Sequence, residues 1–307
     1  MENSESIQDV QITNEPKPAI PWGWLRASLQ FLVWLILVKI VIESIAAVAV
    51  VLIQGQDPTS LMGDPAGAIE KIGIIGMTVI SLIGFGGTIL MVWIFRHFID
   101  KKSMLSLGFE FKGYRNDLLA GMGWGFVLML IGFVALWISG MLKVTSVNFD
   151  PISMFFYLLM FIVVALNEEI LMRGYVLINL MDSMNKYIAL VVSSLLFSAM
   201  HLMNPNVSLV SVINLFLAGI LLGIYFIHKG NLWFPIGMHL TWNFFQGPIF
   251  GFEVSGEITN SLIVQEITGP ELLTGGKFGF EGSLLATVAI IVLTIVIHLK
   301  HKKVEVA

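Results

Sequence analysis

The sequence has no cysteine and few charged residues. Of its 307 residues, 12% are charged and 56% are hydrophobic, whereas a soluble globular domain has about 25% charged and about 45–50% apolar residues. This composition excludes an ordinary soluble enzyme. It also excludes a disordered chain, which needs low hydrophobicity and high net charge. Without cysteine there is no disulfide, no thiol nucleophile and no thiolate metal ligand.

Several well-known catalytic signatures are absent as well. The chain has no His-Glu-x-x-His, the helical zinc motif of many metalloproteases, and no phosphate-binding P-loop. The Gly-x-Ser-x-Gly motif of serine hydrolases is also missing. The net charge of −4 is small and no basic stripe stands out, so no nucleic-acid partner is expected.

The chain does have long apolar runs, and a bilayer-spanning helix needs about 20 apolar residues. The eight candidate segments lie near 27–53, 72–95, 117–140, 153–180, 187–203, 208–227, 232–249 and 283–299. The sequence therefore predicts an all-α, multi-pass protein of the cell membrane with about eight transmembrane helices. We expect a single helical domain over residues 21–303, after a polar and mobile cytoplasmic tail over residues 1–20.

The distribution of Lys and Arg between the loops predicts the orientation. If the N-terminus is cytoplasmic, twelve of these residues lie on the cytoplasmic side and three, Lys71, Lys143 and Lys277, lie on the other. Both termini are therefore expected to be cytoplasmic. The acidic loop at 250–282 then falls on the external side, where we expect its glutamates to be solvated.

Charged side chains inside the apolar segments require a structural or functional explanation, because charge at the bilayer centre is energetically costly. The fourth segment contains Glu168, Glu169 and Arg173. Glu169 and Arg173 are four residues apart and so pair on one helix face, which leaves Glu168 about 100° round the helix. In the first segment, Lys39 and Glu43 have the same spacing, and we expect an internal ion pair there.

Two other segments add histidines and an amide. The fifth ends in Phe197-x-x-x-His201, and the seventh contains His239-x-x-x-Asn243. At about 1.5 Å per residue, Glu168 and His201 both lie roughly 20 Å from the same membrane face, with Asn243 near 18 Å and His239 one turn shallower. The spacing therefore predicts that these four polar groups converge within the membrane.

The residue types leave two chemistries open. A glutamate can take a proton from water, while histidine and asparagine can donate hydrogen bonds to a developing oxyanion. Carboxylate and imidazole are also zinc ligands, so a divalent metal that activates water is an equal alternative. Glycine clusters, such as 84, 86 and 87 or 121, 123 and 125, are interpreted as helix-contact surfaces.

The ordered trio of motifs resembles the CPBP family, which comprises the CAAX proteases and bacteriocin-processing (Abi) proteins and includes the type II CAAX prenyl endopeptidases. The trio is Glu168-Glu169-x-x-x-Arg173, Phe197-x-x-x-His201 and His239-x-x-x-Asn243. The resemblance covers roughly residues 150–250. It implies an intramembrane endopeptidase with an eight-helix fold, whose catalytic core is this region.

The resemblance also implies a role for each site residue. Glu168 would activate the attacking water, and Glu169 and Arg173 would brace it. His201 would position the water, while His239 and Asn243 would stabilise the oxyanion. In the metal alternative the ligands would be drawn from Glu168, His201 and His239.

The expected partners are the lipid bilayer and a peptide or protein substrate that enters from the membrane or the cytoplasm. The substrate would be CAAX-like or a peptide precursor. A non-proteolytic bacteriocin-immunity or scaffold protein, with the same cluster as a binding site, is the alternative. A proton-coupled transporter is less favoured, because transporters often have two related halves and no internal repeat is visible.

Overall fold

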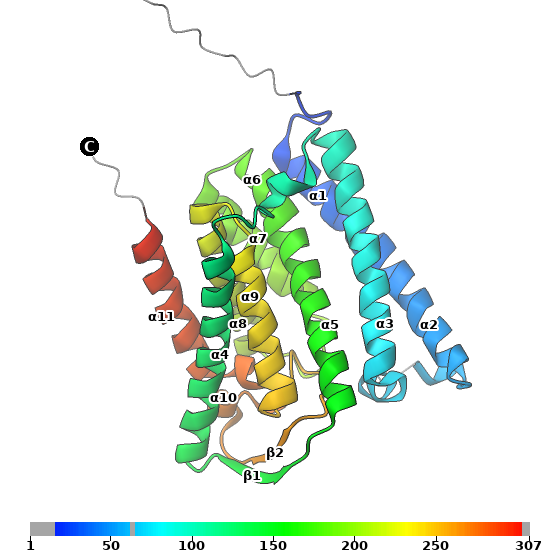
Figure 1. The fold of residues 1–307 in the computed structure, drawn as a ribbon, viewed down its shortest axis with the longest axis vertical. Helices are drawn as coiled ribbons and strands as arrows, with labels where there is room; N and C mark the ends of the chain where they lie inside the picture. The colour runs from blue at the N-terminus through cyan, green and yellow to red at the C-terminus, as the bar shows by residue number, and fades with distance from the viewer. Residues whose placement is uncertain (1–15, 62–64, 303–307) are drawn as a thin grey trace, which may run out of the picture.

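The structure, a computed structural model, describes residues 16–61 and 65–302. Most of this part of the chain is helical (Figure 1). The main helical elements are α1 Gly23–Val33, η1 Trp34–Ile42, α2 Glu43–Ile53, α3 Pro65–Ile94, η3 Phe95–Ile99, α4 Arg115–Ile138, α5 Pro151–Glu169, η5 Ile170–Leu177, α6 Ile178–Met181, α7 Lys186–Met200, α8 Leu209–Lys229, α9 Trp233–Phe244, η6 Phe245–Ile249, α10 Glu271–Thr274 and α11 Leu284–His301. The elements η1, η3, η5 and η6 are π-helical.

The predicted all-α membrane fold is confirmed in its main features. Six helices in the described residues are long and apolar enough to cross a membrane, and α7 is a shorter apolar helix. The count of eight crossings and the cytoplasmic placement of the termini stay predictions. Residues 1–15 of the predicted tail, and residue 303 at the end of the predicted domain, lie outside the described residues.

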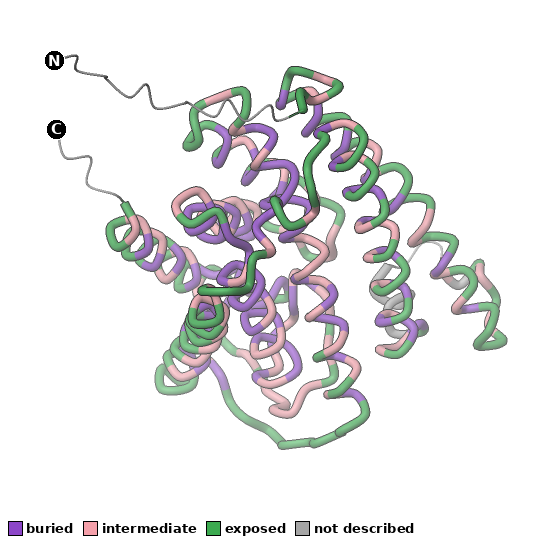
Figure 2. Tube along the Cα trace, turned by 45° about the horizontal axis from the view of Figure 1, so that its top comes forward, coloured by how far each residue is buried: buried purple, intermediate pink, exposed green. Residues whose placement is uncertain are grey.

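The helices surround a buried centre. In Figure 1, α9 lies in the middle of the bundle between α4 and α5, while α11 lies on one side and α2 and α3 on the other. Figure 2 shows buried residues toward the centre of the bundle. All eight residues of η5 are buried, as are most residues of α9 and about half of α8. The outer faces of the peripheral helices expose large apolar side chains, such as Ile40, Ile45 and Val288, which suits contact with lipid chains.

A two-stranded sheet was not predicted. The strands β1 Leu142–Val147 and β2 Ile263–Ile267 pair antiparallel, with an irregularity in register between Val144 and Ser146. They lie at the end of the bundle opposite the N-terminal end of α1 and the C-terminal end of α11 (Figure 1). Because β1 follows α4 and β2 belongs to the loop before α11, the sheet ties that long loop to the bundle.

Only some of the clustered glycines lie at helix contacts. A Cβ on Gly125 of α4 would lie 2.5 Å from the carbonyl oxygen of Met238 on α9, and one on Gly121 would overlap the backbone of Phe234. Gly123, by contrast, has no atom of the described chain within 4 Å of where its Cβ would be. The prediction of a contact surface is therefore right for Gly121 and Gly125 and wrong for Gly123, which faces away from α9.

Replacing Gly125 by alanine should separate α4 from α9 and lower the free energy of unfolding by about 1–3 kcal/mol, as overpacking does. Gly123→Ala is the matched control. It should be neutral or slightly stabilising, because alanine favours a helix over glycine. SDS-induced unfolding in mixed micelles measures both effects, and equal stability of the two variants would contradict the assigned contact.

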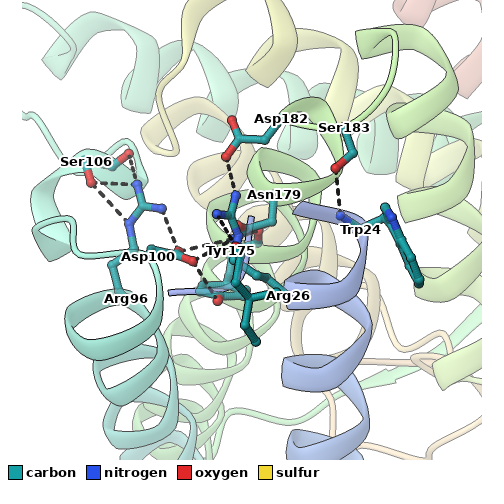
Figure 3. A network of polar contacts seen from close by, with 10 residues as sticks. Trp24, Arg26, Arg96, Asp100, Ser106, Tyr175, Asn179, Asp182 and Ser183 are labelled. Atoms are coloured by element: carbon teal, nitrogen blue, oxygen red, sulfur yellow. Dashed lines mark hydrogen bonds and ion pairs between the residues drawn. The ribbon is translucent and has the colours of Figure 1, made fainter. Parts of the chain in front are cut away.

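A buried polar network joins four elements near one end of the bundle (Figure 3). The carboxylate of Asp100 lies 2.9 Å from the guanidinium of Arg96 and 3.3 Å from that of Arg26. It also accepts hydrogen bonds from the hydroxyl of Tyr175 and the amide of Asn179. The network therefore fixes α1 and the end of η3 against η5 and α6, the segment that follows Glu168 and Glu169.

Asp100→Asn should lower the free energy of unfolding by about 3 kcal/mol, because two buried guanidinium groups lose their shared counter-charge. Asp182 is the matched control. Its side chain is 40% exposed and forms an ion pair with Arg26, so Asp182→Asn should cost less than about 1 kcal/mol. The same unfolding assay compares the two, and a smaller loss for Asp100→Asn would refute the central role of that carboxylate.

Candidate active site

Glu168 and Glu169 lie at the junction of α5 and the π-helical segment η5. The helix α5 begins where Asp150 caps it: one carboxylate oxygen accepts hydrogen bonds from the backbone N–H groups of Ile152 and Ser153. These bonds, together with that from the Ser153 hydroxyl, lower the pKa of Asp150. At the other end of α5, the backbone widens into η5, and π-helical turns often occur at functional sites.

Glu169 holds two other site residues. Its Oε1 lies 2.8 Å from Nη1 of Arg173 and 2.9 Å from Nδ1 of His239. Arg173 also donates to the carbonyl of Gly219 and lies over the ring of Phe197, at 4.4 Å from its centroid. Glu169 and Arg173 are almost completely buried, so the predicted ion pair exists and forms the centre of the site.

Glu168 faces the two histidines. Its Oε2 lies 4.0 Å from Nε2 of His201 and 3.9 Å from Nε2 of His239. Each histidine has its Nδ1 next to an acceptor, the carbonyl of Phe197 for His201 and the carboxylate of Glu169 for His239. In the neutral form Nδ1–H therefore donates, and each Nε2 keeps a lone pair.

The separations around Glu168 are too long for direct hydrogen bonds. They leave room for one small molecule that contacts both imidazoles and the carboxylate. Oε2 of Glu168 is buried and has no hydrogen-bond partner in the described part of the chain. Because a buried acceptor of this kind is costly when unpaired, the geometry favours a bound water at this position.

A cavity of about 250 Å³ adjoins this group. Glu168, His201, His239 and Asn243 all line it, so the predicted convergence of four polar groups is confirmed. The remaining wall comes from η1, α2, α3, α5, α7, α8, α9, the loop that ends before α11, and Ile290 of α11. A single water needs only about 10–15 Å³ of such space, so the cavity has room for substrate groups as well.

We expected the glutamates of the acidic loop at 250–282 to be solvated, but this is wrong for two of them. Glu281 is only 8% exposed, and Glu281 and Glu257 both line the cavity. Burial raises the pKa of each of these carboxyl groups. The reason for the difference is that Phe252, Phe278 and Phe280 from the same loop pack into the core, which draws the loop back over the end of the bundle.

Lys39 also lines the cavity, and its ammonium lies 2.8 Å from the carboxylate of Glu43. The expected ion pair is therefore present. Its position on the cavity wall could not be read from the sequence, since the i,i+4 spacing says nothing about which helix the pair faces.

The metal alternative finds little support in the arrangement of the side chains. Among the described residues, no three His, Asp or Glu side chains lie close enough together to hold a metal ion. The Nε2 atoms of His201 and His239 are each about 4 Å from the Glu168 oxygen, whereas two ligands of one zinc ion, each about 2.0–2.2 Å from it, lie closer together. The residues as placed fit a water better than a metal.

Residues 150–245 match the family model of the Rce1-like type II CAAX prenyl endopeptidases. This segment is similar to the Rce1-like domain. The resemblance to the CPBP and CAAX protease family is thereby confirmed. Comparisons with curated proteins and with solved structures found no match.

The Rce1-like span contains every residue that the motifs singled out. These are Glu168, Glu169, Arg173, His201, His239 and Asn243. The other charged residues of the cavity wall, Lys39, Glu43, Glu257 and Glu281, lie outside this span. The cavity is therefore built from the Rce1-like domain and from parts of the chain that the family model does not match.

Glu169→Gln should lower the free energy of unfolding by about 3–5 kcal/mol, because it leaves the buried guanidinium of Arg173 without a counter-charge. Glu168→Gln is the matched control: Oε2 of Glu168 has no partner within the described residues, so this variant should be as stable as the wild type or more so. Unfolding in mixed micelles tests both. A Glu168→Gln variant as unstable as Glu169→Gln would show that Glu168 also supports the fold.

Proposed function

We propose that this multi-pass membrane protein is an intramembrane endopeptidase in which Glu168 activates the attacking water. The observation that supports this most directly is that Oε2 of Glu168 has no hydrogen-bond partner among the described residues and lies 4.0 Å and 3.9 Å from Nε2 of His201 and of His239, separations that one water beside them can bridge. The match to the Rce1-like endopeptidases supports a peptide as the substrate.

In this proposal, the water donates one hydrogen bond to Glu168 and the other to Nε2 of His201, which orients its lone pair toward the substrate carbonyl. As the water attacks, its proton passes to the Glu168 carboxylate, which acts as general base. A tetrahedral intermediate forms. Glu168 then gives the proton to the leaving amine, so the carboxylate is regenerated when the C–N bond breaks.

The oxyanion of that intermediate needs hydrogen-bond donors. The amide of Asn243 lines the cavity one helical turn from His239 and supplies one. His239 supplies the other in its protonated form, in which Nε2–H donates while Glu169 accepts from Nδ1–H. The carboxylate of Glu169 thus fixes the ring orientation and offsets the imidazolium charge, as the aspartate of a serine-protease triad does.

The substrate class that the family description gives is a CAAX-type protein, and a peptide precursor is the other candidate. Both present an extended segment to the cavity near the membrane.

Cleavage of a quenched peptide library by the purified protein in detergent tests the function. Glu168→Gln should lower kcat/KM by at least about 100-fold, the range that loss of a general base produces, while its stability is kept. A chelator should leave wild-type cleavage unchanged, because the proposed water is activated by a carboxylate.

Three results would count against this mechanism. Equal cleavage by wild type and Glu168→Gln would remove Glu168 from the chemistry. Loss of cleavage with the chelator, restored by zinc, would favour the metal alternative. A wild-type protein that binds peptides from the library and hydrolyses none would support the non-proteolytic binding protein.

A further inference from the structure

A tight turn over residues 254–257 forms part of the cavity wall. Val254 and Glu257 pair through backbone hydrogen bonds in both directions. The two residues between them have positive φ angles, 50° for Ser255 and 86° for Gly256, as a type I′ turn requires. A side chain at Gly256 would overlap the carbonyl of Pro205, so the glycine is needed for space as well as for conformation.

Contacts from three other segments hold this turn in place. The backbone N–H and the hydroxyl of Ser255 both donate to the buried carboxylate of Glu281. The N–H of Gly256 donates to the carbonyl of Phe278, and the amide of Asn204 donates to the carbonyl of Ser255. The turn is therefore a fixed part of the wall, and the backbone position from which the Glu257 side chain extends is fixed with it.

Glu257 is half-buried and lines the cavity, and its carboxylate makes no hydrogen bond to any described residue. Lys39 and His201 are the basic groups that act on it, and Lys39 is already paired with Glu43. Burial raises the pKa of Glu257, so a cation that binds there would also favour the ionised carboxylate.

Two further groups on the wall indicate what the cavity accepts. Oδ1 of Asn167 and Oε2 of Glu168 are buried without a hydrogen-bond partner within the described residues, and both side chains line the cavity. Each is an acceptor, so each calls for a ligand that donates hydrogen bonds.

The ionisable groups of the wall also favour a cationic ligand. Its carboxyl groups are Glu43, Glu168, Glu257 and Glu281, and Lys39 is the only lysine or arginine among its described residues. The wall therefore has more groups that can attract a cation than groups that can attract an anion.

We propose that Glu257 forms a cation-binding subsite that selects substrates with a lysine or arginine side chain close to the scissile bond. This inference rests on the proposed endopeptidase function and specifies its substrate class. The ammonium or guanidinium would donate to Glu257, in a charge-assisted hydrogen bond of the kind that gives both affinity and orientation. The same surface would repel an acidic residue at that position.

Pairs of quenched peptides test the subsite. Each pair differs at one position, within three residues of the cleaved bond, by lysine against norleucine, which has a similar chain without the charge. Wild type should cleave the lysine peptide at least about tenfold faster in kcat/KM at one of these positions. Glu257→Gln should lose this preference while it cleaves the norleucine peptide at the wild-type rate.

Glu266→Gln provides the matched control. Glu266 belongs to the same loop and carries the same charge, but it is exposed on β2, so the preference should be kept. Glu257→Lys should reverse the preference toward a glutamate peptide. Equal cleavage of the lysine and norleucine peptides by wild type at every position would overturn the proposal, as would a loss of preference in Glu266→Gln.

Binding separates this inference from the proposed function. In the Glu168→Gln background, fluorescence anisotropy measures affinity for the lysine and norleucine peptides without cleavage. Tighter binding of the lysine peptide that disappears in the Glu168→Gln/Glu257→Gln double variant supports the subsite, even if the wild type hydrolyses nothing. Equal affinity of the two peptides overturns the subsite and leaves the endopeptidase proposal to the cleavage assay.

Discussion

The buried ion pair between Glu169 and Arg173 is the interaction on which the candidate site depends. Glu169 also holds the ring of His239, and Arg173 reaches the backbone of α8 and the ring of Phe197 on α7. Four helices thus meet at one pair of opposite charges. Because either charge alone would be strongly unfavourable inside the bundle, the pair constrains these helices to one arrangement.

That arrangement explains why Glu168 does not join the ion pair between Glu169 and Arg173. One oxygen of the Glu169 carboxylate pairs with both Arg173 and His239. Glu168, one residue earlier, faces the imidazoles of His201 and His239 instead and forms no direct hydrogen bond with them. The two adjacent glutamates therefore have different surroundings. Different surroundings are what allow identical side chains to take different roles in a site.

Sequence reasoning recovered the groups whose relations follow from helical spacing. The Glu169–Arg173 and Lys39–Glu43 pairs are each one turn apart, and the common depth of Glu168, His201 and Asn243 follows from counting residues along helices. Periodicity could not show which way Gly123 faces, nor that the strand pair exists. It also could not place Glu257 and Glu281 in the cavity, because their positions depend on long-range packing of Phe252, Phe278 and Phe280.

The cavity wall has two parts with different constraints on their sequences. The membrane-spanning helices must remain apolar outside and must keep the buried charges in balance. The loop between η6 and α11 belongs to none of the candidate membrane-spanning helices, although its turn at residues 254–257 contributes directly to the wall. Substitutions in this loop can change the shape and charge of the cavity while the paired groups within the helices are untouched. The shape and charge of the cavity can therefore vary through one loop, independently of the buried ion pair that holds the helices together.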